Sequence, residues 1–254
     1  MFRIFARITF ALFWAILQSA SSQQPPVSGS INLYRYGELL QEHGIELTKS
    51  GLLNALKNSD SSVRYLAAMK FAEDKTTDAV PSIEQALAVE RVPRNQVNLA
   101  FALALLGDEA GNTELKKICT DRKFPSEFRL YAVQYMFDLH VQKDEDCLKA
   151  AEEVIESKNT RLGDRVSALG LLSRFRGLTA EEARDVRRLV AVSLEDPEPV
   201  VRMAAGQAFA GLGDPSAIPS MEAAVKRESD ESVRSVLESA LKKLGEVASP
   251  PDRR

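Results

Sequence analysis

The residues best suited to metal or nucleophilic chemistry are few and far apart. The chain has two histidines, His43 and His140, and two cysteines, Cys119 and Cys147. Neither histidine has a second histidine one helical turn away or a glutamate directly after it. A structural zinc site needs about four ligands at suitable spacing, so we expect no metal site and no cofactor.

The two cysteines allow two interpretations. An even number of cysteines in an exported protein favours a disulfide. Cys119 and Cys147, however, fall near the end of one expected helix and the start of another in the same layer. This places them about one or two turns apart, beyond bridging distance. We therefore expect two half-buried thiols, with the disulfide as the alternative.

Neither sequence motifs nor charge indicates catalysis or nucleic-acid binding. The sequence has no Gly-x-Ser-x-Gly, no phosphate-binding glycine loop and no Cys–His arrangement. It carries 33 Lys+Arg and 36 Asp+Glu with interspersed signs, for a net charge of −3. Nucleic-acid binding needs clustered basic residues. We expect no enzyme activity and no nucleic-acid partner.

One sequence unit recurs through the chain, and its clearest copy spans residues 196–213. Pro199 suits the start of a helix, an apolar stripe follows at helical spacing, and Gly213 suits the end. Six copies, about 32 to 37 residues apart, are anchored at Val63, Asn95, Phe128, Asp164, Val201 and Val233. A period in this range indicates a solenoid, in which each unit buries its apolar face against its neighbours.

The repeated residues resemble those of HEAT repeats, in the short form known as PBS-lyase HEAT-like repeats, over about residues 45–246. The matching stretches are Asp60-x-x-Val63-Arg64, Asp230-x-x-Val233-Arg234, Pro199-x-Val201-Arg202-x-Ala204-Ala205 and Leu212-Gly213-Asp214, with Ala79-Val80-Pro81 and Ala217-Ile218-Pro219 opening later helices. The resemblance implies an all-α, right-handed α–α superhelix of about six helix pairs. It implies little about function, because the fold serves many roles.

Two classes of enzyme in the resembled family are relevant to the function. HEAT-like di-iron hydroxylases need several His-Glu pairs, which this sequence lacks. HEAT-like proteins that act as lyases on bilin chromophores resemble the chain only through the repeat. A chromophore-lyase-like or other small-molecule-handling role is therefore the alternative to a binding scaffold.

Helix pairs are expected to alternate along the whole repeat region. The first helices are expected near 48–57, 79–90, 110–120, 143–157, 179–194 and 216–228, and the second near 61–73, 94–106, 126–139, 161–175, 199–212 and 231–244. Thr48 is a candidate N-cap, and Thr179 with Glu182 matches a capping box.

The termini have a different character from the repeats. Residues 1–22 carry Arg3 and Arg7, an apolar run and a small polar exit, which is the layout of a secretory signal peptide cleaved before Gln23. Its loss would change the net charge from −3 to −5 and leave no stable membrane span; an uncleaved anchor is the alternative. We divide the rest into a linker (23–30), a capping helix (31–47), a solenoid (48–246) and a disordered tail (247–254). The protein is expected to be secreted or periplasmic.

An arginine follows the anchor in most repeats. These arginines are Arg64, Arg129, Arg165, Arg202 and Arg234. They could form a basic ladder along a groove, but a structural role is favoured, in which each pairs with an acid near a turn, and Asp60, Asp196 and Asp230 are placed for this.

The second helices are expected to line the concave face of the superhelix. Candidate binding residues there are Tyr65, Met69, Phe101, Gln134, Phe137 and Gln207. Phe101 and Phe137 are the aromatic anchors that a protein or peptide partner would use. The sequence thus predicts an exported, non-catalytic scaffold for protein–protein contacts, with a partner it does not identify.

Overall fold

The computed structural model describes residues 35–140, 144–157 and 159–248. Throughout these ranges the regular structure is helical, with no strand. The expected signal peptide (1–22) and linker (23–30) lie outside the described residues. The described residues from Tyr36 onward form one compact unit.

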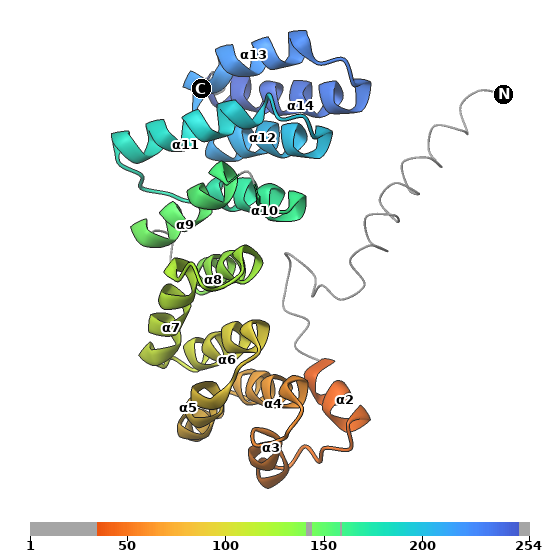
Figure 1. The fold of residues 1–254 in the computed structure, drawn as a ribbon, viewed down its shortest axis with the longest axis vertical. Helices are drawn as coiled ribbons and strands as arrows, with labels where there is room; N and C mark the ends of the chain where they lie inside the picture. Colours follow the sequence, from red (N-terminus) through yellow and green to blue (C-terminus); the bar gives the residue numbers. More distant parts are fainter. Residues whose placement is uncertain (1–34, 141–143, 158, 249–254) are drawn as a thin grey trace, which may run out of the picture. The chain divides into compact units, whose positions relative to one another are not determined.

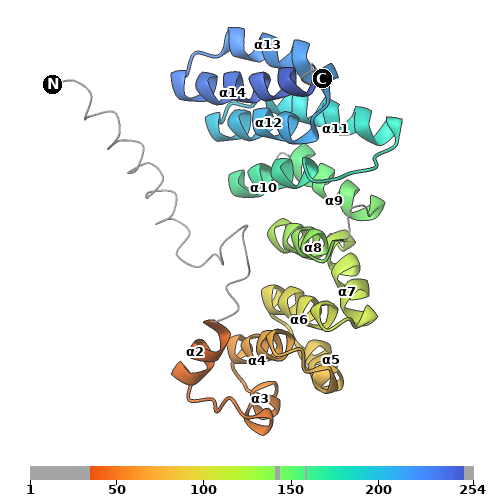
Figure 2. The same ribbon diagram turned by 180° about the vertical axis from the view of Figure 1, so that it is seen from behind.

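The helices alternate between two layers (Figures 1 and 2). The first layer contains α3 (Lys49–Ala55), α5 (Val80–Val89), α7 (Glu109–Thr120), α9 (Glu145–Glu156), α11 (Ala180–Ser193) and α13 (Ile218–Arg227). The second layer contains α4 (Ser61–Glu73), α6 (Pro93–Leu105), α8 (Ser126–Asp138), α10 (Leu162–Leu172), α12 (Pro199–Leu212) and α14 (Glu231–Ala248). α2 (Arg35–Glu42) precedes the first pair. The predicted all-α solenoid of consecutive helix pairs is confirmed.

Short polar side chains begin many of these helices. Thr48 accepts a hydrogen bond from the backbone N–H of Gly51, and Thr179 forms the predicted capping box with Glu182. Aspartates accept from backbone N–H groups in the same way at α4, α7 and α9. These side chains bind amide groups that have no partner inside the helix, and each such cap contributes about 1 kcal/mol.

A residue with left-handed backbone angles follows five of the six second-layer helices. These residues are Lys75, Gly107, His140, Gly177 and Gly213, with φ between 53° and 81°. Gly213 adopts this conformation without steric cost and ends α12. The last helix, α14, continues through Gly245 to Ala248, past its expected end at residue 244. His140 therefore lies at the end of α8, in a left-handed backbone conformation.

The core runs between the two layers, and small residues in it let the helices approach closely. Phe71 and Phe209, at equivalent positions of α4 and α12, are each 1% exposed. Burial of such a side chain contributes about 1.5–3 kcal/mol. Of the helices described, none is long and apolar enough to cross a membrane.

Candidate functional site

The exposed sides of α4, α6, α8, α10 and α12, here called the second-layer face, hold the predicted binding residues. Two of these residues do not reach solvent: Met69 is 4% exposed and Phe101 is 2% exposed. Tyr135 of α8 stacks face to face on Phe101, with ring centroids 4.0 Å apart and an interplanar angle of 9°. The prediction that Phe101 anchors a partner is therefore wrong, because an aromatic side chain of the next helix pair already occupies that position.

The other candidates remain accessible in different degrees. Tyr65, Gln134 and Phe137 are partly exposed, and Gln207 is exposed. Gln134 and Phe137 both lie on α8, whereas Tyr65 is on α4 and Gln207 on α12. The structure thus concentrates the predicted residues on α8 and does not bring Gln207 into the same cluster.

One side of α8 carries a continuous row of accessible polar and aromatic residues. Glu127, Tyr131, Gln134 and Asp138 follow each other at steps of four, three and four residues, which places them on one helix face. We call this row the α8 stripe. The Tyr131 hydroxyl donates to Glu127 Oε1 at 3.3 Å, and Gln134 Nε2 donates to Asp138 Oδ1 at 2.8 Å. Hydrogen bonds between neighbouring residues of the stripe therefore restrain their side chains.

Arginines from both neighbouring helix pairs hold the N-terminal half of the stripe. On one side, Arg94 of α6 lies 3.5 Å from the Glu127 carboxylate and 5.9 Å from the centre of the Tyr131 ring. On the other, Arg161, which precedes α10, pairs with Glu127 at 2.6 Å. Arg161 also lies 3.5 Å from Asp164, which accepts a hydrogen bond from Ser126. Glu127 thus links three consecutive helix pairs.

A second arginine cluster holds the C-terminal half. Arg174, just after α10, lies over the Phe137 ring at 4.7 Å and pairs with Asp138 at 3.3 Å. The edge of Phe175 meets Phe137 with centroids 4.8 Å apart. A partly exposed phenyl ring between a cation and a buried aromatic is a rigid, amphipathic contact surface.

Three tyrosines, Tyr36 of α2, Tyr65 of α4 and Tyr135 of α8, have raised pKa values. Burial, followed by Tyr65 and Glu73, raises the pKa of Tyr36 to about 12. Burial also raises the pKa of Tyr65, against the opposing effect of Arg94, and of Tyr135. The hydroxyls therefore stay protonated at neutral pH, and that of Tyr135 donates to Asn98 Oδ1 at 2.8 Å.

The five repeated arginines contact turns and neighbouring repeats. Arg64 donates to the Asn58 and Ser59 carbonyls and to Glu90, and Arg202 makes the same contacts with the Asp196 and Pro197 carbonyls and with Glu228. In both, the carboxylate comes from the end of the next first-layer helix, so the arginine fastens one pair to the next.

The other three arginines vary this arrangement. Arg129 donates to the Cys119 carbonyl at 2.8 Å and to Glu153 at 3.1 Å. Arg165 pairs with Asp196 in the turn of the next pair. Arg234, in the last pair described, donates to the Glu228 carbonyl. Of these, Arg165–Asp196 is the only predicted partnership that the structure contains.

Asp60 and Asp230, the other predicted partners, have a different role. Asp60 accepts from the backbone N–H of Ser62, and Asp230 from those of Ser232 and Val233. Both carboxylates cap the start of a second-layer helix, because a helix N-terminus offers unpaired donors at short range. Arg64 and Arg202 instead reach buried glutamates 26 residues further along the chain.

The paired glutamates are ionised in the folded chain. Arg202 lowers the pKa of Glu228 and outweighs the opposing effect of burial. Burial by itself would raise the pKa of Glu90, but the Val92 backbone N–H and Arg64 outweigh it and the pKa is lowered. Arg122 first, and then Arg129, lower the pKa of Glu153.

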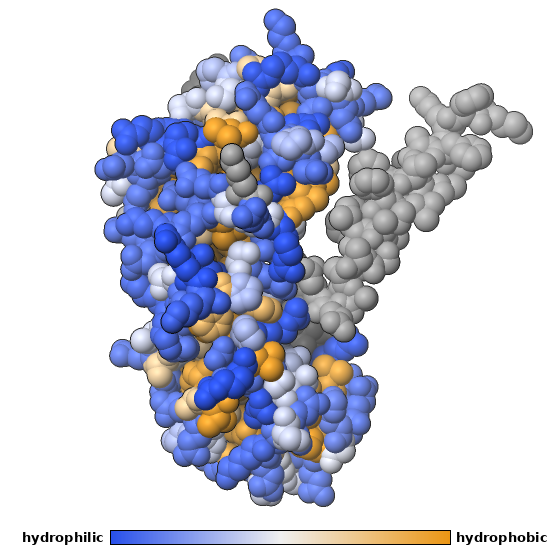
Figure 3. All heavy atoms as spheres, viewed as in Figure 1, coloured by the Kyte–Doolittle hydropathy of each residue, from blue (hydrophilic) through white to orange (hydrophobic). Residues whose placement is uncertain are grey.

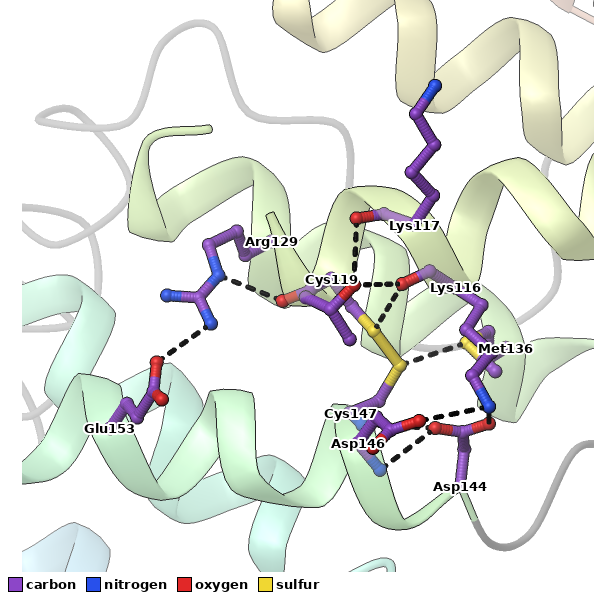
Figure 4. The surroundings of a disulfide bond; sticks show 10 residues. Lys116, Lys117, Cys119, Arg129, Met136, Asp144, Asp146, Cys147 and Glu153 are labelled. Atoms are coloured by element: carbon purple, nitrogen blue, oxygen red, sulfur yellow. Dashed lines mark hydrogen bonds and ion pairs between the residues drawn. A yellow bond between two sulfur atoms is a disulfide. The ribbon is translucent and has the colours of Figure 1, made fainter. Parts of the chain in front are cut away.

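Cys119 and Cys147 form a disulfide bond with a Cα–Cα separation of 5.5 Å (Figure 4). The expectation of two separate thiols is therefore wrong. Cys119 lies in the last turn of α7 and Cys147 in the first turn of α9, and these two helices pack directly against each other. The close packing brings the ends of consecutive first-layer helices nearer than the repeat spacing suggested.

The remaining surface offers little else with site-like geometry. Apolar residues are scattered in small groups among charged ones on the face drawn in Figure 3. A hollow of about 350 Å³ between α3 and α5 is lined in part by Arg64, which is already bound to Glu90. No group of three or more metal-ligating side chains occurs among the described residues.

The sequence analysis did not identify six residues that form or flank the α8 stripe. These residues are Arg94, Glu127, Tyr131, Asp138, Arg161 and Arg174. A usable signal was present. The partners Arg94–Glu127, Arg161–Glu127 and Arg174–Asp138 are 33, 34 and 36 residues apart, which is one repeat period. An alignment of the repeats that compared charges in successive copies would have found them.

The architecture described above defines an α-helical repeat protein built from stacked helix pairs. Residues 165–242 match the family model for HEAT repeats. This part of the chain contains HEAT repeats. No curated protein matches it in sequence.

Several solved structures are similar to the chain at low identity. An engineered protein is 19% identical with a TM-score of 0.44, covering 77% of this chain and 96% of its own. Human deoxyhypusine hydroxylase in complex with glycerol is 15% identical with a TM-score of 0.41, covering 84% and 77%. The Escherichia coli protein YibA is 14% identical with a TM-score of 0.44, covering 87% and 99%. At such scores these likenesses carry no argument about function.

Proposed function

We propose that the protein is an exported, non-catalytic scaffold that binds a protein or peptide through its second-layer face, centred on the α8 stripe. The observation that carries this proposal is the pair of partly exposed aromatic rings on α8. Tyr131 lies beside Arg94 of the preceding pair, and Phe137 lies under Arg174 of the following pair.

The chemistry of this surface favours a macromolecular partner. Aromatic residues and arginine are enriched among the residues that dominate binding energy at protein interfaces. The ion pairs of Glu127 and Asp138 hold the neighbouring arginines before a partner arrives. A surface that is ordered in advance loses less conformational entropy on binding.

Export is supported by two independent features. The first 22 residues have the charge and apolar pattern of a signal peptide. The Cys119–Cys147 disulfide fits an oxidising compartment, since such bonds are rare in the cytosol of mesophiles. Intact-mass analysis of the protein from the envelope or secreted fraction should give a chain starting at Gln23 with one disulfide. A full-length, reduced chain in the cytosolic fraction would contradict export.

The interface is tested by crosslinking and capture from the exported fraction. The test variant is Tyr131→Ala with Gln134→Ala, which shortens the centre of the stripe at two partly exposed positions. The matched control is Val89→Ala with Val192→Ala, two first-layer side chains that are each 64% exposed. Thermal unfolding of all three proteins checks that each is folded.

We expect the wild type and the control variant to capture the same protein and the stripe variant to lose it. Equal capture by all three proteins would place the contact on another surface. If even the wild type captures no protein, the scaffold proposal fails for that compartment.

A further inference from the structure

The disulfide joins two consecutive helix pairs in the first layer. Cys119 is 0% exposed and Cys147 is 1% exposed, so the bond lies inside the core. The cysteines are 28 positions apart in the sequence, and the chain between them includes the whole of α8. The helix that carries the stripe is therefore enclosed in the loop that the bond closes.

α8 also contacts the bond directly (Figure 4). Met136 Sδ lies 3.5 Å from Cys147 Sγ, and Arg129 Nε donates to the carbonyl of Cys119. Both residues are on the side of α8 that faces the first layer, one helix diameter from the stripe. A displacement of either sulfur is thus transmitted to α8.

The reduced cysteines need more room than this junction provides. Bonded sulfurs are about 2.05 Å apart, whereas non-bonded atoms of that size meet at roughly 3.5–4 Å. A close-packed core has no space for such a separation without movement of the helices. We expect the reduced sulfurs to gain this room through a shift of α9 relative to α7.

A shift of α9 reaches the stripe through its arginines. α9 packs against α10, and Arg161 and Arg174 flank α10 on either end. These two arginines supply the α10-side contacts of Glu127 and Asp138. A moved α9–α10 pair would withdraw them from one side of the stripe, while Arg94 on α6 stays in place.

We propose that the oxidation state of Cys119 and Cys147 regulates the second-layer face: the oxidised chain presents the complete α8 stripe and the reduced chain does not. This inference rests on the proposed function, which assigns partner binding to that face. Formation of the disulfide breaks two S–H bonds and forms one S–S bond. The two electrons and two protons pass to a thiol–disulfide oxidant such as glutathione disulfide, which becomes two thiols.

Hydrogen exchange on the mature chain tests the structural part. We compare the oxidised wild type with Cys119→Ala/Cys147→Ala and with wild type that was unfolded, reduced and refolded in a thiol-free reductant. The reduced wild type keeps both sulfur atoms, so it separates loss of the bond from loss of volume. Met221→Ala, which removes an equally buried side chain from α13, is the matched control.

We expect loss of protection in α8, α9 and α10 in both bond-free proteins, with α4 and α12 unchanged. The Met221→Ala control should keep protection in α8–α10. Equal protection of α8–α10 with and without the bond would overturn the inference. A loss that extends to α4 and α12 would overturn it too, because the proposal confines the change to the central pairs.

Partner capture tests the regulatory part. Capture by the oxidised chain and not by the reduced chain supports regulation, and equal capture by both overturns it even if protection differs. If the oxidised chain captures nothing, the proposed function fails, whereas the exchange data still decide whether the bond controls the stripe.

Discussion

The outer and central junctions of the repeat array use the same arginine in different ways. In the outer junctions Arg64 and Arg202 bind glutamates that are 0% and 5% exposed. At the central junction Arg129 binds Glu153, whose side chain is 36% exposed and is shared with Arg122. The disulfide lies at this same junction. The covalent bond thus accompanies the ion pair whose carboxylate is the most exposed.

This difference shows why the middle repeats can depart from the pattern. A buried ion pair depends on close geometry, because removal of one partner leaves an unpaired charge in the core. A disulfide tolerates a changed turn provided that its two Cα atoms stay within reach. We therefore expect the stability of the outer junctions to depend most on the charged residues, and that of the central junction to depend most on the disulfide.

The largest effect is expected for Arg202→Ala. The change leaves Glu228 buried without its partner and should lower the free energy of unfolding by about 3–5 kcal/mol. Denaturant unfolding of the folded protein measures this. Arg188→Ala, whose partner Glu156 is half exposed, should change stability by less than about 1 kcal/mol. Equal stabilities for the two variants would contradict the structural role of Arg202.

Loss of the disulfide should lower the stability by nearly as much as Arg202→Ala. Cys119→Ala/Cys147→Ala opens a loop whose cysteines are 28 residues apart, and its stability should fall by about 3–4 kcal/mol relative to the oxidised wild type. The same comparison in strong reductant should show a much smaller difference. An undiminished difference in reductant would mean that lost side-chain volume, and not the bond, causes the effect.

Arg129→Ala should have a smaller effect than Arg202→Ala. Glu153 keeps Arg122 and remains partly hydrated, so the main loss is the hydrogen bond to the buried Cys119 carbonyl. We expect a decrease of about 1–3 kcal/mol in the free energy of unfolding. A loss as large as that of Arg202→Ala would erase the distinction between the two kinds of junction.

The smallest effect is expected for the pH dependence of stability at the outer junction that contains Glu228. The pKa of Glu228 is lowered from 4.5 in the folded chain. Its contribution is therefore fully present above pH 4.5 and is lost as the pH falls through the lower folded value. The unfolding midpoint of Glu228→Gln should respond less to acid than that of the wild type. Glu246→Gln, at an exposed position, should follow the wild type.

The fold was accessible from sequence because its signals are local. Apolar spacing, N-caps such as Thr48 and Thr179, and the repeat period each depend on neighbouring residues. The site was less accessible, because it depends on contacts between pairs. Phe101 looked like an exposed anchor until Tyr135 of the next pair was found to cover it. The cysteine distance likewise depends on how closely α7 and α9 pack.

On the second-layer face, Glu127 lies between two arginines of the neighbouring helix pairs, Arg94 and Arg161. Deletion of the α7–α8 pair would place Arg94 beside Arg161, two like charges where the chain now has an attraction. Removal of this one helix pair would therefore replace two attractions with a repulsion on this face.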